Sequence, residues 1–174
     1  RLLAGGTDLV VTMKRKAVKP SVIIDIKKVK GLSKINYSKR DGLRVGALAT
    51  LTDLHTSRAV RDNFPFLAQA AGEVGSVQVR NKATLGGNLC NASPAADTTT
   101  PLMAMGAALL IRGPRKEHLV PMDEFFTGPG RTVLKHDEVL TQIEAPALKP
   151  RTGGAFIKLG VRRAMEIALV NVAA

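Results

Sequence analysis

Two pairs of adjacent glycines set the strongest constraint on how this chain can fold. The first pair lies in AGGTDLV, residues 4–10, directly after an apolar leucine pair, and the second lies in TLGGN, residues 84–88. Glycine has no Cβ, so it permits turns and close backbone approaches that other residues resist. Successive main-chain N–H groups in such a turn can converge on one anion, especially ahead of a helix. Each pair therefore predicts either a tight turn or a phosphate-binding loop.

The polar residues around the second pair favour a dinucleotide ligand. AGGTDL lacks the GK[ST] of a Walker loop and does not match G-x-G-x-x-G. The second loop places Thr84, Asn88, Asn91 and Ser93 around its glycines, and Asp97 follows shortly after. Such side chains suit ribose or ribityl hydroxyl groups, whereas glycine N–H groups suit a diphosphate. A dinucleotide held by loops is one interpretation, and Asp97 as a simple helix cap is the other.

Turn signals and hydrophobic patterning predict an α+β chain rather than a uniform doubly wound sheet. The predicted strands are 2–4, 21–26, 34–38, 43–48, one ending at 111, and 138–146; the predicted helices are 8–16, 50–60, one after Pro65 and one from 98. Thr7 is the expected N-cap of the first helix, and Thr50 or Thr52 that of the second. Residues 75–97 and 127–132 are predicted as loops, and 147–154 as a linker before a second strand-rich unit.

Composition narrows the classes of protein to which the chain can belong. Its 174 residues, 45% of them hydrophobic, suit one domain or slightly more with a real core. No apolar run reaches the roughly 18 residues of a membrane span. A net charge of +12 favours anionic partners, but only 3% aromatic residues and no tryptophan disfavour nucleic-acid binding.

The single cysteine excludes a disulfide scaffold and a Cys-based metal site within this chain. It is consistent with a cytoplasmic location, and Cys90 is interpreted as a packing residue rather than a redox thiol. The three histidines lie far apart, without acidic residues at metal-ligand spacing, so no metal site is predicted. Apolar sequence at both ends suggests a piece of a longer protein.

Three longer stretches make the chain resemble a known family. LLAGGTDLVVTMK, VRNKATLGGNLCNASPAADTTTPLMAMGA and RRAMEIALVNVAA are similar to the FAD-binding medium subunit of molybdenum hydroxylases, the carbon monoxide dehydrogenase and xanthine dehydrogenase family. The resemblance implies an α+β fold of the vanillyl-alcohol-oxidase (PCMH) type, with FAD between two α+β subdomains. It implies that this domain covers 1–148, with subdomains of about 1–58 and 59–148, and that 149–174 begins a C-terminal α+β flavoprotein domain.

The resemblance also assigns residues to FAD. In the family the first loop wraps the diphosphate, and the second lies near the diphosphate and the ribityl chain. An acidic residue holds the cofactor, an apolar residue lies near the flavin or adenine end, and a lysine lies near the ring system. The residues that match the first loop are Leu2, Leu3, Ala4, Gly5, Gly6, Thr7, Asp8 and Leu9, and those that match the second loop are Thr84, Leu85, Gly86, Gly87 and Asn88. Asp97 matches the acidic residue, Leu140 the apolar residue and Lys158 the lysine. Val74 stands where some relatives carry an aromatic residue, so no stacking contact is expected there.

The activity that the resemblance implies is electron transfer within a complex. FAD would receive electrons from the iron–sulfur clusters of a small subunit, and these electrons would originate at a molybdopterin-containing large subunit. They would leave to an acceptor such as NAD, a quinone or oxygen. Because the flavin carries the redox chemistry, no catalytic side chain is expected in this chain. Two alternatives stay open: a nucleotide-binding module without turnover, and a basic nucleic-acid-binding domain.

Overall fold

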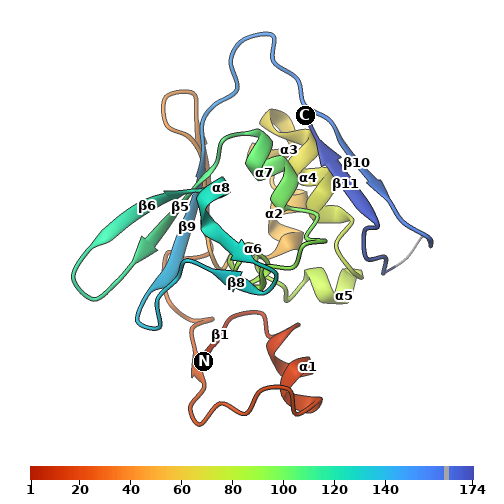
Figure 1. Ribbon diagram of the computed structural model, residues 1–174. Coiled ribbons are helices and arrows are strands. Elements are labelled where there is room, and N and C mark those ends of the chain that lie inside the picture. The colour runs from red at the N-terminus through yellow and green to blue at the C-terminus, as the bar shows by residue number, and fades with distance from the viewer. Residues whose placement is uncertain (163–164) are drawn as a thin grey trace.

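The structure is a computed structural model that describes residues 1–162 and 165–174. Arg163 and Ala164, within the RRAMEIALVNVAA stretch, lie outside the described residues. The described part divides into a small N-terminal unit, a sheet covered by helices, and a C-terminal hairpin (Figure 1). The mixture of helices and antiparallel strands confirms the predicted α+β class.

A five-stranded antiparallel sheet forms the centre of the fold. Its strands are β3 (Ile35–Ser38), β4 (Gly42–Gly46), β9 (Val139–Ala145), β5 (Ala108–Arg112) and β6 (Glu117–Pro121), in that spatial order. The β3–β4 hairpin confirms the predicted turn between 38 and 43, and a glycine with φ of +76° closes it. The sheet joins strands on both sides of residue 58, and the division into subdomains at that point stays a prediction.

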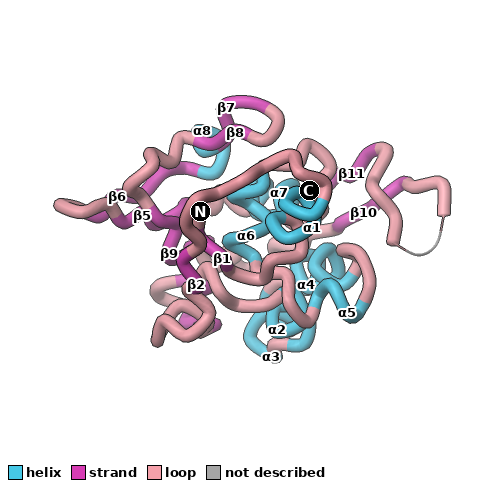
Figure 2. Tube along the Cα trace, turned by 90° about the horizontal axis from the view of Figure 1, so that it is seen from below, coloured by secondary structure: helices cyan, strands magenta, loops and turns pink. Residues whose placement is uncertain are grey.

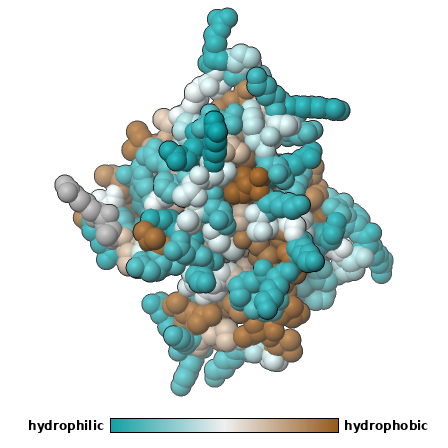
Figure 3. Space-filling view, turned by 180° about the vertical axis from the view of Figure 1, so that it is seen from behind, coloured by the Kyte–Doolittle hydropathy of each residue, from teal (hydrophilic) through white to brown (hydrophobic). Residues whose placement is uncertain are grey.

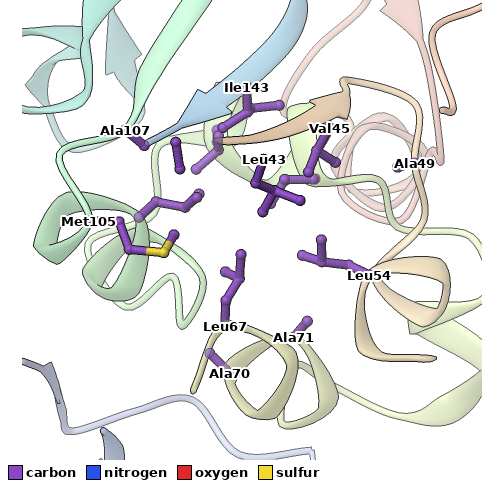
Figure 4. Close-up of a cluster of buried hydrophobic side chains, with 14 of the residues drawn as sticks. Leu43, Val45, Ala49, Leu54, Leu67, Ala70, Ala71, Met105, Ala107 and Ile143 are labelled. Carbon is purple, nitrogen blue, oxygen red and sulfur yellow. The ribbon is translucent and has the colours of Figure 1, made fainter. Parts of the chain in front are cut away.

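Short helices cover one face of this sheet and enclose the core. These helices are α2 (Leu51–Thr56), α3 (Arg58–Asn63), α4 (Pro65–Gly72), α5 (Val77–Arg80), α6 (Leu85–Asn91) and α7 (Thr99–Ala104). Figure 4 shows Leu43, Val45 and Ile143 of the sheet opposite Leu54 and Leu67 of the helices. All five side chains are buried. Burying a leucine or isoleucine side chain contributes roughly 1.5–3 kcal/mol, so this layer holds the helices on the sheet.

Local signals explain where these helices start. Thr50 accepts a hydrogen bond from the N–H of Asp53, whose carboxylate accepts one from the N–H of Thr50. This capping box decides between the two predicted N-caps in favour of Thr50. Pro65 occupies the first turn of α4, where its missing N–H costs nothing. The predicted helix over 50–60 is two helices, because Ser57 leaves the helical region with ψ of 122°.

The N-terminal unit consists of β1 (Leu2–Leu3), α1 (Leu9–Lys14) and β2 (Ile24–Asp25), with the two strands parallel. It lies below the sheet and helices in Figure 1, and Figure 2 looks onto it from below. The prediction of a buried strand over 21–26 is wrong in this structure. Only two of its residues pair, and the side chains of residues 21–25 are exposed. Hydrophobic side chains gather over this unit, in the lower part of Figure 3.

Residues after α7 complete the structure. They form α8 (Met122–Phe125), the small β7–β8 hairpin (Phe126–Gly128 with Arg131–Thr132), and the β10–β11 hairpin (Phe156–Leu159 with Val170–Ala173). The predicted loop over 127–132 is therefore a hairpin. In Figures 1 and 2, β10 and β11 lie on the side of the helices away from β5 and β6. Among the described residues, no helix has the length and apolar character needed to cross a membrane.

Candidate functional site

Both glycine loops line one cleft of about 550 Å³ at the junction of the N-terminal unit and the helices. The sequence predicted that the two loops would lie together, although residues 4 and 84, at which they begin, are 80 positions apart. The predicted residues on its wall are Leu2, Ala4, Gly5, Gly6, Thr7, Asp8 and Leu9 of the first loop and Thr84, Gly87 and Asn88 of the second. Predicted residues Leu3, Leu85 and Gly86 belong to the same loops but do not line the cleft.

The first loop has main-chain donors at residues that line this cleft. Within the described part of the chain, the amides of Gly5, Gly6, Thr7 and Asp8 donate no hydrogen bond to protein. Gly6 has a φ of +78°, a conformation that a residue with a Cβ adopts only with strain. Four consecutive unpaired N–H groups beside a positive-φ glycine form a concave turn suited to an anion.

The start of α1 differs from the prediction. The helix begins after Asp8, not Thr7, and the Asp8 side chain makes no capping hydrogen bond. The N–H of Val10 donates to Gly6 O at 3.0 Å, and the N–H of Thr12 donates to Asp8 O at 2.9 Å. Thr7 lies in the turn before the helix, where it lines the cleft.

Gly5 fixes the distance between the two loops. A Cβ at this position would overlap the carbonyl oxygen of Lys82 and lie 2.9 Å from the Cα of Ala83. Both contacts are to backbone, which cannot rotate away as a side chain can. The glycine therefore allows the first loop to pack directly against the residues that precede the second loop.

The second loop is a short helix, α6, not the open loop that its sequence predicts. Its amides are already occupied: Leu85 N–H donates to Ala49 O at 2.9 Å, and Gly86 N–H donates to Ala47 O at 2.9 Å. Gly87 N–H donates to the hydroxyl of its N-cap Thr84 at 3.1 Å. These amides therefore have partners within the protein in this structure, and their contact with a diphosphate stays a prediction.

The glycines of α6 have a different role, which is close packing. A Cβ at Gly86 would lie 2.6 Å from the Cβ of Ala47 and 2.7 Å from its carbonyl oxygen. Gly87 faces the cleft, and an added Cβ there meets only the Thr84 hydroxyl, at 2.8 Å. From α6 the cleft therefore receives side chains, including the amides of Asn88 and Asn91.

Asp97 and Lys158 meet in a buried ion pair. The Lys158 Nζ lies 2.7 Å from Asp97 Oδ2, and the two side chains are 5% and 6% exposed. Lys158 also donates to the carbonyl oxygens of Glu73 at 3.2 Å and Glu166 at 3.0 Å, so its three donors are all used. Asn171 donates to Asp97 Oδ1 at 3.3 Å. Burial raises the pKa of Asp97, while the hydrogen bond from Lys158 opposes that rise.

This pair ties the segment after α6 to the C-terminal hairpin. Asp97 precedes α7, whereas Lys158 lies in β10 and Asn171 in β11. Neither Asp97 nor Lys158 lines the cleft; Lys158 lines a second cavity of about 420 Å³ with Glu73 and Arg80. The interpretation of Asp97 as a helix cap is not supported, because α7 follows Thr98 and no side-chain cap is formed. Direct contacts of Asp97 and Lys158 with FAD stay predictions.

Leu140 lies in the core. It is 4% exposed in β9, where it pairs with Ile111. It does not line the cleft, so its contact with FAD also stays a prediction.

Residues beyond those assigned to FAD from the sequence complete the cleft wall. They are Arg1, Thr12, Val18, Val74, Val79, Ala83, Cys90, Asn91 and Gly130. Asn91 was within the polar stretch that drew attention to the second loop. Gly130 had no local signal, because it reaches the cleft through a non-local bond from its N–H to Ala92 O at 2.9 Å. Val74 lies on the wall, where it offers an aliphatic surface rather than a ring.

The environment of Cys90 disfavours a reactive thiol, and its interpretation as a packing residue stays a prediction. Although the residue is exposed, the protein around it desolvates the thiol and raises its pKa to about 12. The thiolate is the reactive form, so the side chain is neutral and slow to react near pH 7. Within the described residues, no three His, Cys, Asp or Glu side chains are grouped to hold a metal ion.

We expect the alkylation rate of Cys90 to keep rising across alkaline pH. An ordinary thiol with a pKa near 8.5 approaches its maximum rate by about pH 9.5. For Cys90 the thiolate fraction should instead grow about tenfold per pH unit between pH 7.5 and 10. Iodoacetamide labelling followed by peptide mass spectrometry measures this rate, with a free cysteine peptide as the reference. A profile that levels off near pH 9 would contradict the assignment.

Comparison with known proteins places these loops in a family. The model described as "FAD binding domain in molybdopterin dehydrogenase" matches residues 1–148. A xanthine dehydrogenase FAD-binding subunit of Escherichia coli O157:H7 is 37% identical over 175 residues, covering 100% of this chain and 60% of the relative. The carbon monoxide dehydrogenase medium chain of Hydrogenophaga pseudoflava is 35% identical, and the match covers 91% of this chain and 55% of the relative.

Solved structures share the fold over nearly the whole chain. A carbon monoxide dehydrogenase from Hydrogenophaga pseudoflava matches with a TM-score of 0.91 and 34% identity, covering 97% of this chain and 58% of that one. A quinoline 2-oxidoreductase from Pseudomonas putida 86 matches with a TM-score of 0.92 and 31% identity, and the match covers 99% of this chain and 59% of that one. The chain thus spans about 60% of the length of the relatives that it matches.

Proposed function

Because the chain belongs to the family of FAD-binding domains in molybdopterin dehydrogenases, we propose that its cleft holds the diphosphate of FAD. The family match over residues 1–148 supports this range as the FAD-binding domain, with 149–174 as the start of the next one. When bound, FAD supplies the redox chemistry of such a subunit. The residues of this chain bind the cofactor and orient it.

One observation carries the proposal: four residues of the first loop whose amides donate to no described residue line a cleft whose other wall is α6. Each N–H bond to a charged phosphate is worth roughly 1.5–3 kcal/mol, so even two of them outweigh diffuse attraction from exposed lysines. Distant surface charge is screened over about 8 Å at physiological salt. The net charge of +12 therefore does not select the ligand, whereas the loop geometry does.

We further propose the place of this subunit in electron transfer. A small iron–sulfur subunit would deliver electrons to FAD, after their release at a molybdopterin-containing large subunit. NAD, a quinone or oxygen would then accept them. The names of the relatives support a dehydrogenase complex, and the FAD-binding subunit is the component to which this chain is similar. The cytoplasm is the proposed location.

Titration of the full-length protein with FAD tests the assignment. We expect stoichiometric binding with flavin absorbance, bleaching by an electron donor, and return of the absorbance with one acceptor among NAD, quinone and oxygen. Bound flavin that cannot be reduced and reoxidised would favour a nucleotide-binding module without turnover. Salt-dependent binding to DNA or RNA without any flavin binding would favour the nucleic-acid alternative.

A further inference from the structure

The side chain of Asn88 is held by a single buried hydroxyl. Thr98 is 0% exposed, and its Oγ1 donates to Asn88 Oδ1 at 2.7 Å. Asn88 lines the cleft from the first turn of α6, whereas Thr98 lies ten residues later, immediately before α7. Two segments that the sequence separates are thus joined at the cleft wall by one hydrogen bond.

This hydrogen bond determines what the amide of Asn88 can offer a ligand. An asparagine side chain has an acceptor oxygen and a donor nitrogen on opposite sides. With the oxygen engaged by Thr98, the Nδ2 remains, and it donates no hydrogen bond to the described residues. Asn88 therefore presents a donor to the cleft, which suits a phosphate oxygen and not a hydroxyl proton.

The donor matters because the rest of α6 has none to spare along its first turn. The amides from Leu85 to Asn88 already donate to protein oxygens. A hydrogen bond from this part of α6 to a diphosphate held by the first loop must therefore come from a side chain, and Asn88 is the cleft residue whose amide a buried hydroxyl orients. A reversed amide would instead direct an oxygen lone pair at an anion.

Thr98 is itself held in place by its neighbours. Asp97, the preceding residue, is fixed by the buried ion pair with Lys158 and by Asn171. Thr100, two residues later, donates to Asn171 Oδ1 at 2.9 Å. The hydroxyl of Thr98 is therefore presented to Asn88 from a segment anchored on the C-terminal hairpin.

We propose that Thr98 is a positioning residue, which orients the Asn88 amide so that its Nδ2 faces the cofactor diphosphate. The proposal rests on the proposed function of the cleft. Thr98 acts through Asn88 and has no contact with the ligand, since it is fully buried and absent from the cleft wall.

The test measures FAD dissociation constants of the full-length protein and four variants at Asn88 and Thr98, one of them the double variant. Thr98→Val keeps the shape and removes the donor, so affinity should fall roughly tenfold, the value of one hydrogen bond to a charged group. Thr98→Ser keeps the hydroxyl and should bind within about threefold of the parent. In an Asn88→Ala background, adding Thr98→Val should change affinity less than twofold, because the amide to be oriented is gone.

A further variant tests the direction of the amide without altering Thr98. Asn88→Asp can still accept the Thr98 hydroxyl, but it places negative charge where the diphosphate is expected. It should therefore bind FAD more weakly than Asn88→Ala. Binding equal to or tighter than that of Asn88→Ala would overturn the proposal, even if Thr98→Val failed to fold.

The outcomes separate this proposal from the function on which it rests. A parent protein that does not bind FAD would refute the function. A parent that binds FAD, with Thr98→Val binding equally well, would refute only the positioning role. Equal losses from Thr98→Val in the parent and Asn88→Ala backgrounds would show a structural effect unrelated to the amide, which also contradicts the proposal.

Discussion

Replacing Gly5 by alanine is expected to lower the affinity for FAD by about 10- to 100-fold. The added Cβ overlaps the carbonyl oxygen of Lys82 and lies 2.9 Å from the Cα of Ala83, so the first loop must move away from the second. Forcing extra carbon into a packed site costs typically 1–3 kcal/mol, and 1.4 kcal/mol corresponds to a factor of ten in binding. Here the moving part is the loop that carries the phosphate donors.

A matched control separates this effect from the general effect of an added methyl group. Gly153 has no heavy atom within 4 Å of an added Cβ and does not have a positive φ. Gly153→Ala should bind FAD like the parent. Isothermal titration of both variants in the full-length protein gives the comparison, and thermal melts of the flavin-free forms report folding. If Gly5→Ala bound FAD as tightly as Gly153→Ala, contact between the two loops would not control the site.

The second large effect concerns the buried ion pair. Lys158→Met should lower the free energy of unfolding by about 3–5 kcal/mol, because it leaves the Asp97 carboxylate buried without its partner. Arg58→Met is the control, since Arg58 and Asp62 form an exposed pair with side chains 94% and 59% accessible. Pairs of that kind contribute at most about 1 kcal/mol. Chemical denaturation of the full-length protein measures the free energy of unfolding of both variants, Lys158→Met and Arg58→Met.

The pH dependence of the Lys158→Met effect identifies its cause. Burial already raises the pKa of Asp97 above 3.8, and loss of Lys158 removes the opposing influence and raises it further. A group with a raised folded-state pKa contributes stability that is lost as the pH rises through that pKa. The difference in unfolding free energy between parent and variant should therefore be larger at pH 8 than at pH 5. An equal difference at both pH values would indicate lost packing rather than an unpaired charge.

The sequence predicted those parts of the fold that depend on local signals. The β3–β4 hairpin follows from a four-residue turn between alternating strands, and the start of α2 follows from Thr50 and Asp53. Residues 75–97 were predicted as loop, but contain α5 and α6. These helices have four and seven residues, too few turns to establish a hydrophobic period. Hydrogen bonds from α6 to the carbonyl oxygens of Ala47 and Ala49 hold that helix in place, and local sequence does not reveal them.

The sequence predicted that the two glycine loops share a cleft, but not which of their amides have partners within the protein. Two glycine pairs indicated two loops around one ligand, and both line the same cleft. A glycine pair alone does not say whether its amides are free. Those of Gly5 and Gly6 donate to no described residue, whereas those of Gly86 and Gly87 are used within the protein. The distinction depends on partners distant in sequence, as does the contact between Asn88 and Thr98.

The most direct test of the account is a crystal structure of the full-length protein with FAD. The diphosphate should lie within hydrogen-bonding distance of the main-chain amides of Gly5 to Asp8, with α6 as the opposite wall of the cleft. A dinucleotide bound elsewhere, with those four amides still free of it, would contradict the central claim.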